Sequence, residues 1–190
     1  MSILSCYHGT SVSRAREFLD KKEIHLSVCG DPSSTEYRDL WLGDGFYLFD
    51  DPFHAFKWIV NQCHFGESGS FDLETLRHRF CMLQCKLNYQ QTRTFDLRQT
   101  EYMAIFQKVL EKIRNKAVQD VRIPFGKIPD GVVINYMFSR MNYDKRFDLV
   151  CAVYKFNEDN FTGIPKLKLG FVPQTQYCVK KKTLIEDIRE

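Results

Sequence analysis

Three short stretches of the 190-residue sequence carry side chains that could do chemistry. In the first, His8 precedes Gly9 and Thr10, so a hydrogen-bonding imidazole stands beside a backbone that a ligand can approach closely. The second holds two aromatic residues, Tyr47 and Trp58, with ten residues between them. Two flat rings that face each other form a slot for a planar heteroaromatic ligand, and the alternative is that both rings are core residues.

The third stretch lies near the C-terminus and begins at Pro173. Gln174 and Gln176 stand two residues apart in a segment that reads as a strand, so their amides share one face of it. Amide side chains both donate and accept hydrogen bonds. The pattern therefore places two polar groups side by side on an otherwise apolar strand.

The aromatic pair depends on a predicted strand followed directly by a helix. Residues 46–49 form an apolar run after Gly43 and Gly45, which indicates a strand entered through a tight turn. Asp50 or Asp51 can cap the helix that follows, and Pro52 suits its first turn. We expect this helix over residues 53–64, with an apolar face made of Phe53, Phe56, Trp58 and Ile59.

The rest of the chain alternates between strand-like and helix-like patterns. Helices are expected over 13–21, 73–77, 99–117 and 183–188, and residues 131–141 read either as a helix or in part as a strand. Strands are expected over 3–8, 24–27, 79–89, 92–97, 147–156, 166–170 and 175–180, with loops over 28–40, 65–70 and 121–130. The mixture predicts an α+β fold, one domain over residues 1–190, with helices around a small, mostly antiparallel core.

Composition sets the class of protein. The chain is 44% hydrophobic and 27% charged with a net charge of +3, which is ordinary for a soluble globular protein and too weak to indicate nucleic acid. No apolar stretch approaches the roughly 20 residues of a membrane helix, and the first residues show no leader. The seven cysteines, an odd number, sit mostly in apolar runs, which favours reduced thiols in the cytoplasm.

A zinc site built on Cys81, Cys85 and His78 is the metal alternative. Cysteines four apart on a strand lie roughly 13 Å from each other, too far to share one ion. We therefore expect no metal site.

Together the three stretches resemble the ADP-ribosyltransferase superfamily, in the branch shared by diphtheria toxin and the poly(ADP-ribose) polymerases, and especially its small bacterial members. That branch carries His-Gly-[Ser/Thr] on its first core strand, matched by residues 8–10. A glycine-rich turn then precedes a strand with a tyrosine, and a second aromatic follows after ten residues; residues 43–49 and Trp58 match this. A late strand opens with Glu-Tyr, where this chain has Gln176-Tyr177.

The resemblance implies a small split sheet with peripheral helices and a site that binds NAD as a substrate. His8 would hydrogen-bond the adenosine ribose, and the Gly9 backbone would hold the nicotinamide carboxamide. Thr10 would assist at the ribose. Tyr47 and Trp58 would sandwich the nicotinamide ring.

The resemblance also implies an enzyme that transfers ADP-ribose to a macromolecule and releases nicotinamide. Phe46 would join the NAD-binding set, and His8, Tyr47 and Gln176 would be the catalytic set. Gln176 departs from the family, because it brings a dipole to a place where the family has a carboxylate; Glu101 is a weaker candidate for the missing acid.

Three readings therefore stay open: a mono-ADP-ribosyltransferase of toxin, effector or defence type, an NAD glycohydrolase, and a silent NAD-binding or protein-interaction module. The acceptor is a protein or a nucleic acid, no membrane is involved, and a cognate antitoxin or regulatory partner fits such a role.

Overall fold

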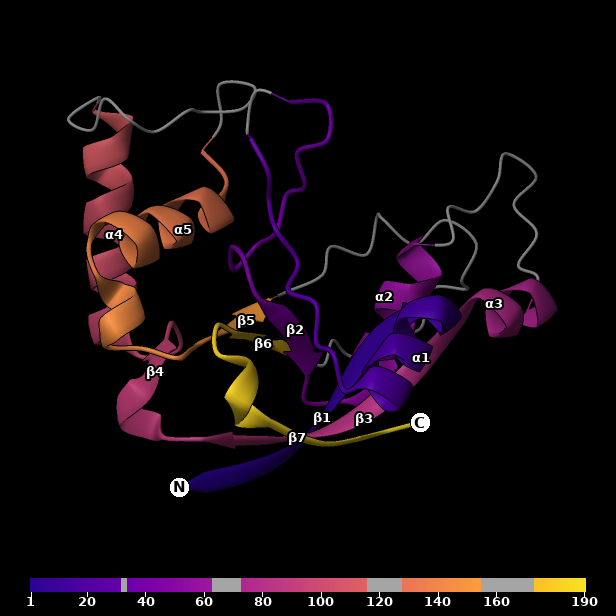
Figure 1. The fold of residues 1–190 in the computed structure, drawn as a ribbon. Coiled ribbons are helices and arrows are strands. Elements are labelled where there is room, and N and C mark those ends of the chain that lie inside the picture. The colour runs from indigo at the N-terminus through magenta and orange to yellow at the C-terminus, as the bar shows by residue number, and fades with distance from the viewer. Residues whose placement is uncertain (32–33, 63–72, 116–127, 155–172) are drawn as a thin grey trace.

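A seven-stranded sheet forms the centre of the molecule (Figure 1). The computed structural model describes residues 1–31, 34–62, 73–115, 128–154 and 173–190. The strand order is β4-β5-β6-β2-β1-β3-β7, and neighbouring strands are antiparallel except β4 and β5, which are parallel. The strands are β1 Ser2–Ser11, β2 Phe46–Phe49, β3 Phe80–Tyr89, β4 Thr94–Asp96, β5 Leu149–Tyr154, β6 Gln174–Val179 and β7 Ile185–Arg189.

Helices pack on the sheet, α4 and α5 toward one end and α1, α2 and α3 toward the other (Figure 1). Their bounds are α1 Val12–Lys21, α2 Pro52–Gln62, α3 Leu73–Arg79, α4 Thr100–Arg114 and α5 Asp130–Arg140. Local signals set their ends: Ser11 caps α1 by accepting from Arg14 N, and Asp51 Oδ1 accepts from Phe53 N at 2.7 Å ahead of α2. Pro52 is the first residue of α2, a position whose backbone N–H would have no partner within the helix, so the missing N–H of proline costs no hydrogen bond.

One face of the sheet, which we call the α1 face, packs against α1. Side chains alternate between the faces of a strand, and Cys6, Leu48 and Tyr177 point to this side. They form a buried cluster with Ala15 and Phe18 of α1. Because side chains alternate along a strand, the residues that precede and follow Cys6, Leu48 and Tyr177 in the chain point to the opposite face of the sheet.

The opposite face, which we call the α5 face, carries two separate clusters. Over β5 and β6, Val150 and Cys178 pack with buried residues of α4 and α5, and Tyr47 packs against this group. Over β3, Ile59 and Val60 of α2 pack with Leu76 of α3 and with the side chains of Phe80 and Met82. The α5 face is therefore covered by two separate groups of helices.

Most predicted elements are confirmed, and the α+β architecture is among them. Residues 130–140 are helical, so the segment that the sequence left open is a helix. The helix expected over 99–117 is α4, which buries Phe106, Val109 and Ile113. The 24–27 strand is wrong in extent: it is reduced to an isolated bridge between Ser27 and Gly45.

The C-terminal segment differs from its prediction. In place of a helix over 183–188, a short 3₁₀ turn at Lys182–Leu184 leads into β7, which pairs with β3. Ile185 is buried against the α1-face cluster and Ile188 packs against it. Long-range strand pairing thus decides the conformation of this segment.

The inner face of α2 also differs from its prediction. Phe53, Phe56 and Trp58 are exposed by 55%, 37% and 36%, whereas Ile59 is buried and so is His54, which was not part of the predicted apolar face. The buried residues of α2 are therefore His54, Ala55, Ile59 and Val60, and the predicted apolar face is only partly the buried one.

The predicted strand at 166–170 and the loop at 65–70 lie outside the described residues, as does the loop at 121–130 as far as residue 127. Among the helices in the described ranges, none is long and apolar enough to cross a membrane.

Candidate functional site

The sheet opens between β1 and β2, at the point where the first two sequence motifs meet. Within the described residues, these strands share the single pair Tyr7–Phe49. Gly45 exchanges both of its backbone hydrogen bonds with Ser27 at 2.9 Å, and the Tyr47 carbonyl accepts a hydrogen bond from the His8 side chain. In the segment 45–49, every second residue therefore directs its backbone N–H and C=O toward β1. By the same alternation, the N–H and C=O of Gly9 face β2 opposite Tyr47, beyond the last residue pair of the two strands. We call this unpaired position of Gly9 and Tyr47 the opened rung.

Helix α2 closes over Gly9 from the α5 face. A methyl group on Gly9 would lie 2.7 Å from the Ala55 carbonyl oxygen, 2.8 Å from Ile59 Cγ1 and 3.1 Å from Trp58 Cε3. Only glycine therefore permits this approach. The Trp58 ring therefore lies against Gly9, which brings a residue of the second sequence motif next to a residue of the first.

Tyr47 lies on the same face, on the other side of the opened rung. Its hydroxyl donates to the Gly43 carbonyl at 2.7 Å and accepts from Leu42 N at 3.0 Å. Burial raises the pKa of this hydroxyl well above its ordinary value, so it stays protonated and keeps both bonds. Among the described residues no ring contact joins Tyr47 to Trp58; Gly9 lies between them.

The turn that holds Tyr47 is itself held from two sides. Asn135 of α5 accepts from Asp44 N at 2.7 Å and donates to Asp44 Oδ1 at 2.8 Å. Lys180, just after β6, donates to the Leu42 carbonyl at 2.8 Å and also to the Asp44 carbonyl. Gly43, at φ +71°, leaves no room for a side chain, because a Cβ there would lie 2.3 Å from Asn135 Oδ1.

Gln174 and Gln176 are buried on the α5 face, with 2% and 5% of their surface exposed. Gln176 stands opposite Phe49, next to the strand that carries Tyr47. The Oε1 atom of each glutamine is buried and has no hydrogen-bond partner among the residues that the structure describes. Because buried polar atoms are nearly always paired, these two acceptors on one strand could each take a hydrogen bond from a water or from a ligand.

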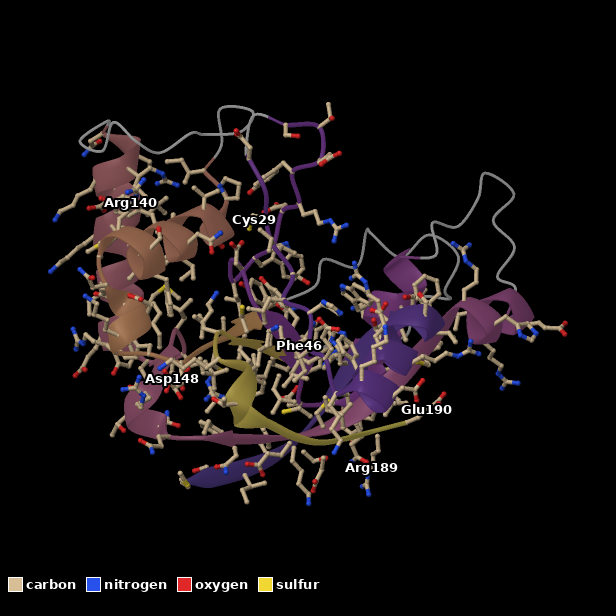
Figure 2. All side chains as sticks on the ribbon, in the orientation of Figure 1. Cys29, Phe46, Arg140, Asp148, Arg189 and Glu190 are labelled. Atoms are coloured by element: carbon tan, nitrogen blue, oxygen red, sulfur yellow. The ribbon has the colours of Figure 1, made fainter. Side chains whose placement is uncertain are left out.

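His8 lies on the α1 face. Its Nδ1 is 2.8 Å from the Tyr47 carbonyl oxygen, so Nδ1 carries the proton and Nε2 is unprotonated. The ring stacks on Phe46 at 4.2 Å, near the centre of the molecule (Figure 2), and meets the edge of Phe18 at 5.9 Å. Burial lowers its pKa from 6.5 to about 4.

The structure therefore divides the predicted site residues between the two faces. Gly9, Tyr47, Trp58 and Gln176 share the α5 face around the opened rung. The side chains of His8, Thr10 and Phe46 lie on the α1 face, where Thr10 and Phe46 are buried. Glu101 is exposed in the first turn of α4 and touches none of these residues in the hydrogen bonds and ion pairs found among the described residues.

Sequence reasoning missed Asn135, Lys180 and His54. Asn135 and Lys180 act across 91 and 138 residues of chain, which no local pattern reveals. His54 had a signal: it precedes Trp58 by four positions, so the two share one side of the helix.

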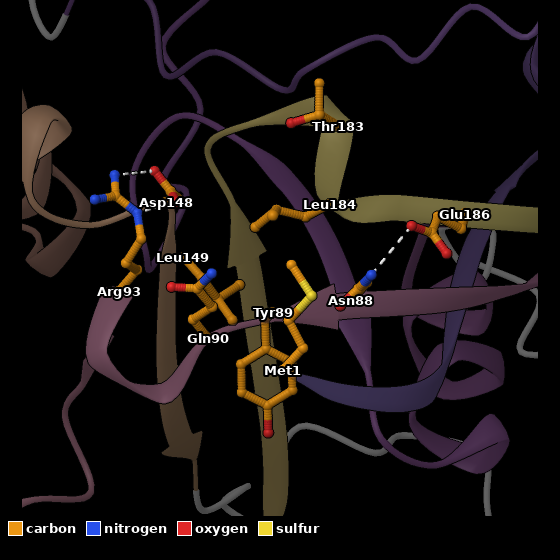
Figure 3. Close-up of a pocket in the computed structure, with 10 residues that line it drawn as sticks. All are labelled: Met1, Asn88, Tyr89, Gln90, Arg93, Asp148, Leu149, Thr183, Leu184 and Glu186. Atoms are coloured by element: carbon orange, nitrogen blue, oxygen red, sulfur yellow. Dashed lines mark hydrogen bonds and ion pairs between the residues drawn. The ribbon is translucent and has the colours of Figure 1, made fainter.

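A cavity of about 240 Å³ lies elsewhere (Figure 3). Asp148 and Arg93 stand at its wall, joined by two hydrogen bonds of 2.5 and 2.8 Å, and Lys181 adds an ion pair to Asp148 at 2.6 Å. These bonds, Arg93 first, hold the pKa of Asp148 below its usual range. Arg93 and Asp148 are thus paired with each other, and none of the predicted site residues is among the residues that line this cavity.

Comparisons with known proteins give one relative and no family. No protein-family profile matches the chain, and no solved structure matches it. The chain is 29% identical, over 198 aligned residues, to the uncharacterized protein MJ0359 of Methanocaldococcus jannaschii, an alignment that covers 97% of this chain and 86% of that protein. The two proteins are thus similar over nearly their whole lengths.

Proposed function

We propose that the chain is an NAD-dependent mono-ADP-ribosyltransferase with an ADP-ribosyltransferase-like fold, which moves ADP-ribose from NAD to a macromolecule and releases nicotinamide. The observation that carries the proposal is the opened rung at Gly9. It presents one backbone N–H and one C=O between an aromatic ring of β2 and an aromatic ring of α2.

Nicotinamide is complementary to that arrangement. Its carboxamide has an NH2 donor for the Gly9 carbonyl and a C=O acceptor for the Gly9 N–H, while its flat ring suits the space beside Tyr47 and Trp58. Both aromatic side chains reach this place from fixed elements. Tyr47 is held by its hydroxyl and Trp58 by the packing of α2 on Gly9.

Gln176 supports the second half of the proposal. Nicotinamide leaves with the electron pair of the glycosidic bond, and positive charge grows on the ribose. An acceptor oxygen aimed at a ribose hydroxyl stabilises that charge through a fixed dipole. The buried and unpaired Oε1 of Gln176 is such an oxygen. A carboxylate would stabilise the growing charge more than an amide does. Removing one preorganised polar group from an active site raises the barrier by roughly 3–4 kcal/mol, so we expect slow turnover with Gln176.

An NAD glycohydrolase needs the same slot and uses water as the acceptor, and a silent NAD-binding or interaction module needs only the binding half. The absence of a carboxylate at Gln176 is the feature that favours the silent module. Six free cysteines in the described ranges suit a cytoplasmic protein, in which an antitoxin or other regulatory partner would act.

One assay separates the three functions. Purified protein is incubated with NAD labelled in its adenosine part, with and without a cell extract, and nicotinamide release is measured together with label on macromolecules. A transferase releases nicotinamide and leaves label that is removed by protease or by nuclease, according to the acceptor. A hydrolase leaves free ADP-ribose alone. A silent module releases nothing while NAD raises its melting temperature, and no effect of NAD at all would contradict the proposal.

A further inference from the structure

His54 is a buried titratable group that the proposed site does not yet use. Its surface is 3% exposed, and its Nδ1 atom is buried without a hydrogen-bond partner in the described part of the chain. An unpaired nitrogen in such a place costs stability, as a buried polar atom without a partner does. The same condition holds for the Oε1 atoms of Gln174 and Gln176.

The backbone places His54 beside the proposed site. Phe49, the last residue of β2, is paired with Gln176, and only four residues separate it from His54 in the first turn of α2. The next residue, Ala55, has its carbonyl oxygen against Gly9, and Trp58, four positions after His54, also meets Gly9. Residues four apart share a helix side, so His54 is on the side of α2 that faces the sheet.

The surroundings of His54 keep the ring neutral. Burial is the largest influence and lowers its pKa, and Lys57 lowers it further, while Asp50 and Asp51 act in the opposite direction. The strands under α2 add Tyr7 of β1 to this face. The charged residue that β3 places on this face, Lys86, forms an ion pair with Asp187. A neutral imidazole offers one lone pair to a donor.

We propose that His54 is a further catalytic residue, whose neutral imidazole accepts a hydrogen bond at Nδ1 from a hydroxyl of the nicotinamide ribose next to Gln176. The inference rests on the proposed function. Two uncharged acceptors then share the work that one carboxylate does in the family that the sequence resembles.

The proposal makes turnover depend on pH. The bond between the ribose carbon and nicotinamide breaks, its electron pair leaves with nicotinamide, and the ribose becomes positive. A protonated His54 would have no lone pair for the hydroxyl and would set a positive charge beside the one that develops. Activity should therefore disappear as the pH falls through the pKa of His54.

The test is the pH profile of kcat/KM for nicotinamide release between pH 4.5 and 8, for the wild type, His54→Gln and His54→Phe. The wild type should lose about tenfold per pH unit on the acid side. His54→Gln, which accepts a hydrogen bond but does not titrate there, should lose that dependence and run about tenfold below the wild-type plateau. His54→Phe should fall further, by about a hundredfold. His25→Gln, the same change at an exposed histidine, should match the wild type.

The possible results separate the two proposals. If the wild type turns over NAD and His54→Gln keeps both its rate and its acid dependence, the role of His54 is refuted while the function stands. If the wild type neither binds nor consumes NAD, both proposals fall. His54→Gln retains the size and polarity of the buried site, so a folding failure of His54→Phe does not remove the test; melting temperatures identify such a failure.

Discussion

Gln176 is the residue on which the difference between a working and a silent NAD site depends. Its amide is buried next to β2, and within the described ranges its oxygen has no hydrogen-bond partner. A dipole stabilises a growing positive charge less than a carboxylate does. The chemical outcome therefore responds to a change of this one group.

We predict that Gln176→Glu raises the rate of nicotinamide release and that Gln176→Ala lowers it. The gain should lie between about tenfold and a few hundredfold, since one oriented charge contributes up to roughly 3–4 kcal/mol, and the loss should be about tenfold. Initial rates at saturating NAD measure both. Gln84→Glu on β3 is the matched control, because Gln84 is engaged by Ser5 and Arg189 instead. Equal rates for all variants would contradict the role of Gln176.

His8 provides a second prediction at this scale, for stability. Its pKa is about 4 in the folded protein and 6.5 when unperturbed, so below pH 6.5 the unfolded chain binds the proton more readily than the folded chain. The contribution of His8 is present above pH 6.5 and is lost as the pH falls toward 4, by at most about 3 kcal/mol.

Urea unfolding of the wild type and His8→Gln over pH 4–8 measures this effect. The free energy of unfolding of the variant should decline less between pH 6.5 and 4. His78→Gln, at an exposed position, should follow the wild type. Parallel curves for His8→Gln and the wild type would show that the ring is not held neutral.

At the scale of elements, α5 and the end of β6 position the turn that carries the Tyr47 anchor. Asn135 and Lys180 bind the backbone of residues 42–44, and the Tyr47 hydroxyl binds the same turn. The ring of Tyr47 is therefore fixed by elements distant in sequence. Losing one of these contacts should loosen the nicotinamide slot.

We predict that Asn135→Ala lowers the free energy of unfolding by about 1–3 kcal/mol, because Asp44 N–H loses its partner in a partly buried place. It should also weaken NAD binding at least several-fold through Tyr47. Ser139→Ala, one turn further along α5, is the control, since Ser139 is exposed and its hydroxyl binds within the helix. Urea unfolding and NAD titration measure the two effects, and NAD affinity unchanged in Asn135→Ala would argue against this positioning.

The elements also show how far sequence reasoning reaches. Strong periodicity predicted α4, and a capping aspartate followed by Pro52 predicted the start of α2. The sequence pattern failed at β7, whose conformation comes from pairing with β3. It also failed at α2, where Ala55 and Ile59 pack closely against Gly9 and the predicted apolar face is only partly buried. Both failures come from long-range contacts that local propensity does not contain.

At the scale of the whole molecule, the sheet has a short interruption in an otherwise continuous order of strands. β1 pairs with β3 over ten residues but with β2 at one position, so the central pair of strands separates where Gly9 and Tyr47 stand. Two groups of helices cover the α5 face on either side. The sequence predicted that the rings of Tyr47 and Trp58 would face each other near His8. The structure places both side chains on the α5 face without a ring contact between them among the described residues, and it places the His8 ring on the opposite face.

The central claim is that the Gly9 backbone receives the carboxamide of nicotinamide. Its most direct test is the amide signal of Gly9 in protein labelled with 15N-glycine, a small set because the chain has ten glycines. Nicotinamide and NAD should shift the Gly9 signal in a saturable way, whereas nicotinic acid, which lacks the NH2 donor, should leave it nearly unchanged. A Gly9 signal that stays in place at saturating NAD, while other glycines move or none does, would contradict the account.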